Sequence, residues 1–210
     1  MFIKIIIQYM LKRTIRKIIL RKRNNYTLEQ LQNKSVQIKN ILFENFNFNN
    51  LKNIHVFLPI LEKKEIDTYH IINHIHDCYP NIDIIVPKIK FDNNGLIKGI
   101  FDNYIYRKNT LLQKNKYSIP EPVNSKLYDN KCGVIDMVII PLLGIDKNGH
   151  RVGYGGGFYD RFLAVDGFRS IKVGLCIEPF LKITDIELTD VKLDYCILPN
   201  KNNQLYLYKF

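Results

Sequence analysis

Apolar residues recur at two different spacings along this chain, and the alternation between the two predicts an α/β fold. Short apolar runs typical of buried strands occupy residues 55–58, 82–86, 134–140, 171–177, 194–198 and 205–208. Helical spacing occurs in residues 10–21, 27–43, 67–78 and 158–165. Residues 96–106 follow the turn residues Asn93, Asn94 and Gly95 and are predicted as a hairpin arm. Because helices separate several of the strands, we expect a layered fold with a mostly parallel central sheet flanked by helices.

The length and composition indicate one domain. The chain has 210 residues and 46% hydrophobic residues, which is enough for a sizeable core. No internal repeat and no linker divides it. We therefore expect a single domain over residues 12–210, preceded by an extension of residues 1–11.

The cysteines indicate a reducing, cytoplasmic environment. Cys78, Cys132, Cys176 and Cys196 lie far apart and form no CxxC pair. Three of the four fall in apolar or aromatic runs, so we expect buried thiols and neither a disulfide framework nor a zinc site.

The charge favours anionic partners. The formal net charge is +11, and no acidic residue precedes Glu29 in a strongly basic amino-terminal stretch. Phosphates, polyacidic metabolites and nucleic acid all remain compatible with it. The apolar run at residues 2–7 is far shorter than the about 20 residues needed to cross a bilayer, so no membrane span is expected. An organellar presequence remains an alternative for the extension.

A glycine loop lies between a predicted strand and a predicted helix. A turn at residues 146–149 leads to Gly153, Gly155, Gly156 and Gly157, and the helix begins at Phe158. Glycines let backbone N–H groups approach an anion, and a helix amino terminus favours phosphate. No Walker A lysine follows and the GxGxxG register is missing, so the residues leave open a phosphate cradle or an ordinary tight loop.

Two carboxylates near this loop are candidate Mg²⁺ ligands. Asp160 falls in the first turn of the predicted helix, and Asp190 lies four residues before Asp194. Mg²⁺ in phosphate sites usually takes one or two carboxylates, although either residue could equally be a helix-terminal or surface charge. No acidic or cysteine partner completes a metal-binding set with His70, His74 and His76, and we expect no metal there.

The stretch PLLGIDKNGHRVGYGGGFYDR, residues 141–161, resembles the signature of 5-formyltetrahydrofolate cyclo-ligases. Four further blocks follow the order of that family: KRTIR at 12–16, EIDT at 65–68, IPEP at 119–122 and DVKLD at 190–194. Ordered blocks are more specific than any single motif. The sequence departs from the family in its extension, in longer Asn- and Lys-rich connectors, and in CILPN after the last block.

The resemblance implies a cytoplasmic, monomeric enzyme that closes 5-formyltetrahydrofolate to 5,10-methenyltetrahydrofolate with ATP and Mg²⁺, releasing ADP and phosphate, without nucleic acid. It implies catalytic roles for Arg151, Tyr154 and Asp160, and Mg²⁺ ligation by Asp160 and Asp190. The implied ATP contacts are Lys12, Arg13, Thr14, Ile15, Arg16, Arg151, Val152, Gly153, Tyr154, Gly155, Gly156, Gly157, Phe158 and Tyr159. The implied folate contacts are Arg16, Leu58, Glu65, Tyr154, Gly155, Gly156, Gly157 and Phe158.

Two alternatives remain. A homologue could bind nucleotide or folate without turnover. A basic nucleic-acid-binding protein would bind in a way that falls steeply with salt and is indifferent to folate.

Overall fold

The structure is a computed structural model that describes residues 11–91, 97–129, 133–165 and 169–210. Seven strands of this part of the chain form one sheet in the order β11-β10-β9-β6-β1-β2-β3. Its strands are β1 (Asn53–Val56), β2 (Asp83–Phe91), β3 (Ile97–Tyr106), β6 (Met137–Pro141), β9 (Ile171–Leu175), β10 (Tyr195–Pro199) and β11 (Leu205–Lys209). The five inner strands are parallel, and β3 and β11 close the two edges by antiparallel pairing. The predicted mostly parallel sheet is confirmed.

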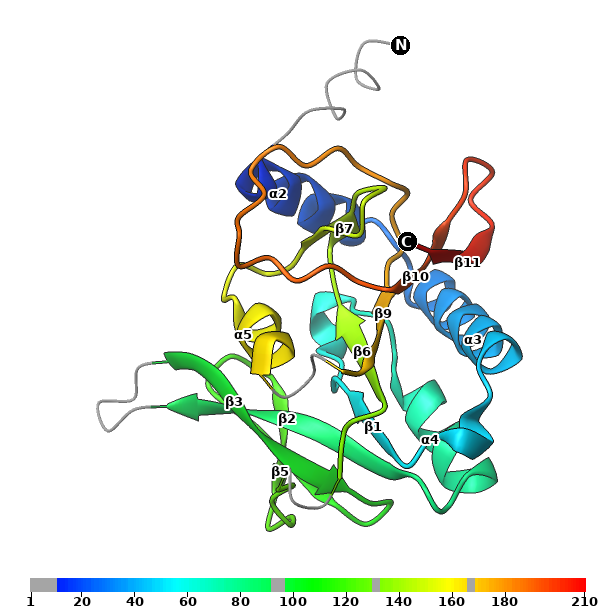
Figure 1. Ribbon diagram of the computed structural model, residues 1–210. Coiled ribbons are helices and arrows are strands. Elements are labelled where there is room, and N and C mark those ends of the chain that lie inside the picture. The colour runs from blue at the N-terminus through cyan, green and yellow to red at the C-terminus, as the bar shows by residue number, and fades with distance from the viewer. Residues whose placement is uncertain (1–10, 92–96, 130–132, 166–168) are drawn as a thin grey trace.

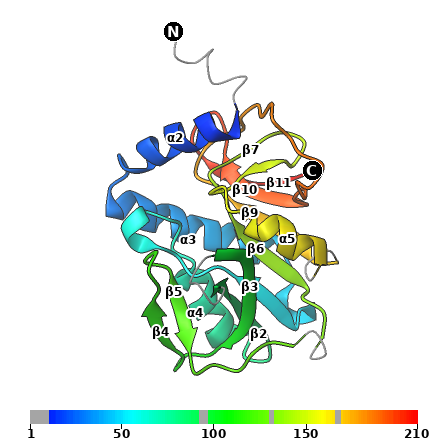
Figure 2. The ribbon, with the colours of Figure 1, turned by 90° about the vertical axis from the view of Figure 1, so that its left-hand side faces the viewer.

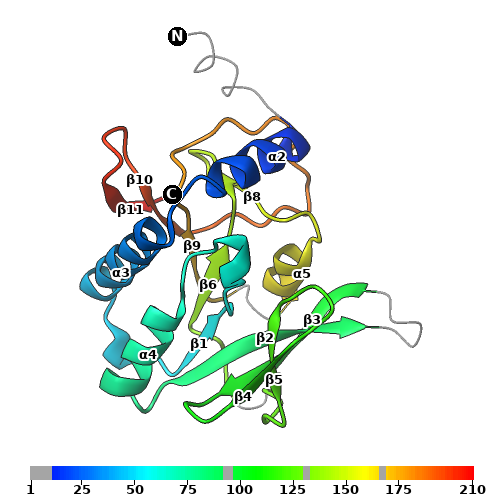
Figure 3. The ribbon, with the colours of Figure 1, turned by 180° about the vertical axis from the view of Figure 1, so that it is seen from behind.

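Helices cover both faces of this sheet (Figures 1 and 3). They are α2 (Lys12–Arg23), α3 (Leu28–Asn45), α4 (Tyr69–Cys78) and α5 (Phe158–Val165). The core of α3 and α4 contains Ile84 and Ile139, whereas the core of α5 contains Ile85 and Ile140. Neighbouring strand residues thus point to opposite faces, and both faces are apolar, as in a sheet buried between two helical layers.

Helix α2 packs outside these layers, against a small hairpin above the sheet (Figure 2). The hairpin consists of β7 (Gly144–Ile145) and β8 (Arg151–Val152), joined by the predicted turn. Ile15 and Ile19 on one face of α2 are buried with Leu143, Val152 and Ile183. The amphipathic spacing of α2 therefore serves to dock a basic helix onto the loops that carry the glycines.

The start of α3 carries a capping box. Gln30 donates its backbone N–H to Thr27 Oγ1 at 3.1 Å, and Thr27 donates its N–H to Gln30 Oε1 at 2.9 Å. This reciprocal pair satisfies two backbone donors that a helix amino terminus otherwise leaves unpaired. The local sequence thus sets where α3 begins.

Some elements differ from the sequence expectation. Strand β2 was expected to end at Val86 but continues through Pro87 to Phe91. Strand β1 pairs with β2 only as far as Ile85, so a proline beyond that point removes no ladder bond on that side. The IPEP block forms part of an unexpected hairpin of β4 (Leu111–Lys114) and β5 (Pro120–Val123). Two short 3-10 helices, η1 (Phe48–Asn50) and η2 (Leu61–Lys63), were also not expected.

The cysteines follow the expectation in part. Cys176 and Cys196 are buried, and burial raises the pKa of Cys176 to about 12. Cys78 is exposed at the end of α4, because the helix turns its isoleucines and not this residue toward the core. Cys132 and the predicted extension up to Met10 lie outside the described residues.

Candidate active site

The candidate site is a cavity at the topological switch point of the sheet, where successive strands stop being added on one side of β1 and start being added on the other. From β1 the chain adds β2 on one side, and then returns to add β6, β9 and β10 on the other. Ligands of open α/β sheets bind outside the carboxyl ends of the strands at such a switch point. A cavity of about 530 Å³ opens there, next to Leu58 after β1 and Pro141 at the end of β6.

Helix α2 supplies cations to one end of this cavity. Lys12 and Arg16 are four residues apart and share a helix face, and both line the cavity. Arg16 donates from Nε to the carbonyl of Gly153 at 2.8 Å, so the helix holds the glycine loop directly. The amino terminus of α2 is closed by Asp185, whose Oδ1 accepts the backbone N–H of Lys12 at 2.7 Å. A carboxylate there also complements the helix dipole.

The glycine loop forms one wall of the cavity. Gly155 and Gly157 have φ angles of +101° and +64°, a backbone region that favours glycine. A Cβ on Gly156 would lie 2.7 Å from the ring of Phe158, whereas a Cβ on Gly153 would meet no atom within 4 Å. The loop ends at Phe158, where α5 begins. Open space beside Gly153 and a helix amino terminus at the same wall suit an anionic ligand.

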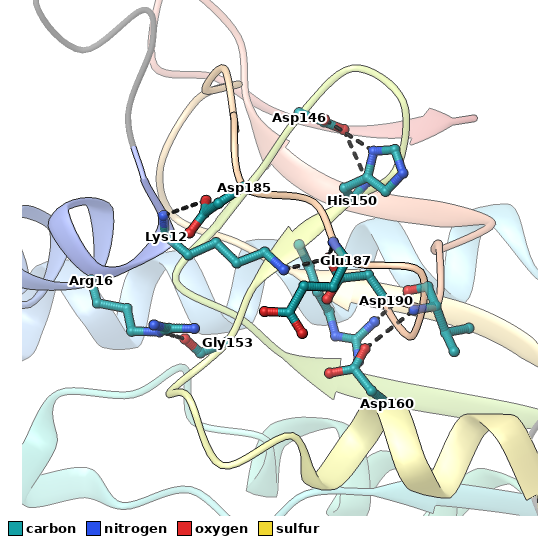
Figure 4. Close-up of polar contacts among 11 residues, drawn as sticks. Lys12, Arg16, Asp146, His150, Gly153, Asp160, Asp185, Glu187 and Asp190 are labelled. Atoms are coloured by element: carbon teal, nitrogen blue, oxygen red, sulfur yellow. Dashed lines mark hydrogen bonds and ion pairs between the residues drawn. The ribbon is translucent and has the colours of Figure 1, made fainter.

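Three acidic residues gather at the cationic end, with Lys12 reaching them from α2 (Figure 4). Asp160 accepts from Arg151 at 2.7 Å and from the N–H of Val191 at 3.2 Å, both on Oδ1. Asp190 accepts the Glu187 N–H at 2.8 Å and forms an ion pair with Lys12, both on Oδ2. No hydrogen bond from the described residues reaches the second oxygen of either carboxylate.

These ion pairs shift the pKa values of Asp190 and Arg151. Burial alone raises the pKa of Asp190, but its hydrogen bonds and the charges of Lys12 and Arg151 bring it below its usual value. Burial lowers the pKa of Arg151, which the carboxylates of Asp160 and Asp190 oppose. The ion pair with Lys12 thus favours the charged form of the Asp190 carboxylate.

The opposite end of the cavity is apolar with one buried carboxylate. Leu58, Phe101 and Phe158 line it, and the two phenyl rings are stacked with centroids 6.3 Å apart. Glu65, after η2, is only 7% exposed and accepts the N–H of Ile60 on Oε2 at 2.8 Å. One cavity thus joins a charged end to an apolar end that contains a hydrogen-bond acceptor.

The comparisons identify the family. Residues 9–199 match the model of the 5-formyltetrahydrofolate cyclo-ligase family. The chain belongs to this family. A 5-formyltetrahydrofolate cyclo-ligase of Mycoplasma genitalium is 29% identical over 135 residues, which cover 59% of this chain and 81% of that protein. One of Mus musculus is 28% identical, and the alignment covers 55% of each chain. The predicted family, and with it the prediction of an enzyme of the ligase class, are confirmed.

Solved structures support the fold. The 5,10-methenyltetrahydrofolate synthetase of Aquifex aeolicus superposes with a TM-score of 0.72 at 23% identity, over 94% of this chain and 92% of that one. The synthetase of Mycoplasma pneumoniae gives a TM-score of 0.61 at 20% identity, over 89% and 98%. At these identities the likeness shows the shared α/β fold.

Most site residues predicted from the cyclo-ligase signature come together in this cavity. Those that line it are Lys12, Arg16, Leu58, Glu65, Arg151, Gly153, Tyr154, Gly155, Gly156, Gly157, Phe158, Tyr159, Asp160 and Asp190. Four do not line it: Ile15 and Val152 are buried in the core under α2, Arg13 is exposed, and Thr14 is half-buried. The ATP and folate contacts of all the predicted site residues, lining the cavity or not, stay predictions.

Other residues at the site have no counterpart among the predictions. Lys63, Phe101, Tyr117 and Glu187 line the cavity, and Arg23 contacts Tyr154 behind it. Glu187 could have been found from the acidic stretch before Asp190. The rest carry no signal in the sequence, because β3, the 3-10 helix and the β4–β5 hairpin reach the cavity only in the folded chain.

Proposed function

We propose that this cyclo-ligase closes 5-formyltetrahydrofolate to 5,10-methenyltetrahydrofolate, with ATP as co-substrate and Mg²⁺ as cofactor, and releases ADP and phosphate. The observation that carries the proposal is the single cavity with two unlike ends. Lys12, Arg16 and the glycine loop suit a polyphosphate, whereas Glu65 among apolar and aromatic side chains suits a flat ring with N–H donors.

The chemistry needs activation of a poor leaving group. The formyl oxygen attacks the γ-phosphorus of ATP, and ADP leaves. N10 then attacks the formyl carbon and loses its proton, and the oxygen departs as phosphate. Phosphoryl transfer is catalysed mainly by positioning and by neutralising charge, so we assign Lys12, Arg16 and Arg151 to the phosphates.

Asp160 and Asp190 fit a Mg²⁺ site of the kind that completes its coordination with phosphate oxygens and water. Each uses only one carboxylate oxygen in its hydrogen bonds. Within the described residues no group of three or more His, Cys, Asp or Glu could hold a metal ion alone. Bound Mg²⁺ neutralises phosphate charge, and Lys12 and Arg151 hold the two carboxylates in position for it.

The test is a spectroscopic assay. Purified protein with 5-formyltetrahydrofolate and Mg²⁺ is expected to produce the methenyl-folate absorbance only when ATP is added, with one ADP per product. Glu65→Gln is expected to weaken folate binding and leave ATP binding intact. Folded protein that binds both ligands without forming product would favour a non-catalytic homologue, and binding of neither would reject the proposal.

The remaining expectations are part of the same proposal. We infer a cytoplasmic monomer that works without nucleic acid. Among the described residues no helix is long and apolar enough to cross a membrane. Sedimentation of the purified protein, with and without nucleic acid, tests whether it is a monomer and whether it binds nucleic acid.

A further inference from the structure

A buried arginine lies behind the cavity without an acidic partner. Arg23, in the last turn of α2, is only 4% exposed. It donates from one guanidinium nitrogen to the hydroxyl of Tyr154 at 2.5 Å and from the other to the carbonyl of Leu142 at 3.5 Å. Within the described part of the chain it forms no ion pair with a carboxylate, and its Nε has no partner. A buried cation in this position needs an anion nearby.

Two buried carboxylates lie near Arg23: Glu178, which pairs with Lys22 at 3.1 Å, and Glu65. The hydroxyl of Tyr154, which accepts from Arg23, also interacts electrostatically with the carboxylate of Glu65. The guanidinium can only donate, so the hydroxyl accepts from Arg23 and keeps its own proton to donate toward a carboxylate such as that of Glu65. Tyr154 as a whole is 43% exposed, so its ring lines the cavity while its hydroxyl reaches the two buried groups.

A second contact ties the same two segments together. Lys64, next to Glu65, donates from Nζ to the carbonyls of Asn24 at 2.6 Å and Tyr26 at 2.7 Å, just after α2. Lys64 also ends η2 with a left-handed φ of 54°. The loop that carries Glu65 is therefore fixed to the end of α2 independently of Tyr154, and the Arg23–Tyr154–Glu65 chain can orient the carboxylate within that frame.

We propose that Arg23 is a positioning residue that acts through the hydroxyl of Tyr154 to hold the carboxylate of Glu65 toward the N–H donors of the folate ring. The inference rests on the proposed function, because it takes Glu65 as the folate acceptor. A charge-assisted chain of hydrogen bonds is stronger and more directional than an isolated acceptor. The same helix thus serves the phosphates with Lys12 and Arg16 and the folate with Arg23.

The experiment is a double-mutant cycle on steady-state kinetics. Arg23→Met is expected to raise KM for 5-formyltetrahydrofolate about tenfold, with KM for ATP changed less than about twofold and kcat nearly constant. Tyr154→Phe is expected to raise the same KM by a similar factor. In a Glu65→Gln background, Arg23→Met is expected to add less than about twofold, because its route to the substrate is gone. Arg23→Lys should recover part of the loss. Arg21→Met, on the exposed side of the same helix, is the matched control and should change nothing.

Additive effects in the double variant, or equal rises in both KM values, would overturn the positioning role. If Arg23→Met does not fold, Tyr154→Phe carries the test, because it removes a single oxygen from a half-exposed side chain. Wild-type turnover in the same assay separates the proposed function from the positioning role of Arg23. If the wild type turns over normally and the effects of the two substitutions are additive, only the positioning role is rejected. If the wild type does not turn over, the cycle is measured as folate affinity by calorimetry, and wild-type protein that does not bind folate overturns both.

Discussion

The guanidinium of Arg151 donates to the carboxylate of Asp160 at 2.7 Å, so a residue assigned to phosphate binding neutralises one assigned to Mg²⁺. Lys12 and Asp190 repeat this arrangement across the same end of the cavity. Three cations, Lys12, Arg16 and Arg151, stand against three acids there, with Glu187 as the third. The internal pairs thus match the two kinds of charge, cationic Mg²⁺ and anionic phosphate, that we propose bind here.

Replacing Asp160 by asparagine keeps a hydrogen-bond acceptor for Arg151 but removes the negative charge. We expect kcat to fall by at least about 100-fold, since Mg²⁺ loses a ligand where charge develops on the transferred phosphoryl group. The methenyl-folate assay measures this over a range of Mg²⁺ concentrations. Asp77→Asn, in an exposed ion pair with Lys108, is the control. Unchanged kcat at saturating Mg²⁺ would remove Asp160 from the metal site.

Lys12→Met is expected to raise KM for ATP about tenfold, equivalent to about 1.4 kcal/mol, and to change KM for folate much less. The reason is that Lys12 lies at the charged end of the cavity, far along α2 from Arg23. Lys17→Met, exposed on the same helix, separates this local effect from a general loss of positive charge. A larger rise for folate than for ATP would move Lys12 to the other end of the site.

The sequence predicts much of this site because its signals are local. The turn before Arg151 and the helix from Phe158 depend on neighbouring residues, and each is found where expected. The family resemblance added Leu58 and Glu65, which line the cavity with the glycine loop.

What the sequence could not predict depends on contacts between distant segments. Arg23 resembles the exposed basic residues around it, and only the packing of α2 buries it beside Tyr154. Glu121, between the two prolines of the IPEP block, is buried and accepts the N–H of Ile89 at 2.9 Å. It thereby joins the β4–β5 hairpin to the part of β2 that lines the cavity. The spacing of residues in these segments predicts neither the contact of Arg23 with Tyr154 nor that of Glu121 with Ile89.

The glycine loop offers a test that separates ligand contact from folding. Gly153→Ala places its Cβ in open space, so we expect the melting temperature to change by less than about 2 °C. If phosphates lie against this loop, the same methyl group should raise KM for ATP about tenfold. Gly156→Ala is the contrasting variant, because its Cβ must displace the ring of Phe158 and should also affect folate binding. Normal ATP affinity in Gly153→Ala would argue against a phosphate cradle at this position.

A buried histidine predicts how stability depends on pH. His55 in β1 is fully buried among Phe101, Tyr159 and Phe162, and neither ring nitrogen has a hydrogen bond of good geometry among the described residues. Burial lowers the pKa of His55 to about 3, a change that a contact with Asn103 only partly opposes. The unfolded chain binds a proton at an ordinary histidine pKa, whereas the folded chain does not.

The contribution of His55 to the free energy of unfolding is therefore complete above pH of about 6.5 and is lost progressively as the pH falls toward about 3. Between about pH 7 and pH 5 the loss is on the order of 2 kcal/mol, since one proton is worth about 1.4 kcal/mol per pH unit. Urea unfolding of wild type and His55→Leu at both pH values measures it. His55→Leu should lose less stability than wild type by this amount, because leucine does not titrate. Equal losses in the two proteins would mean that His55 binds its proton in the folded chain as readily as in the unfolded chain, so that burial does not lower its pKa.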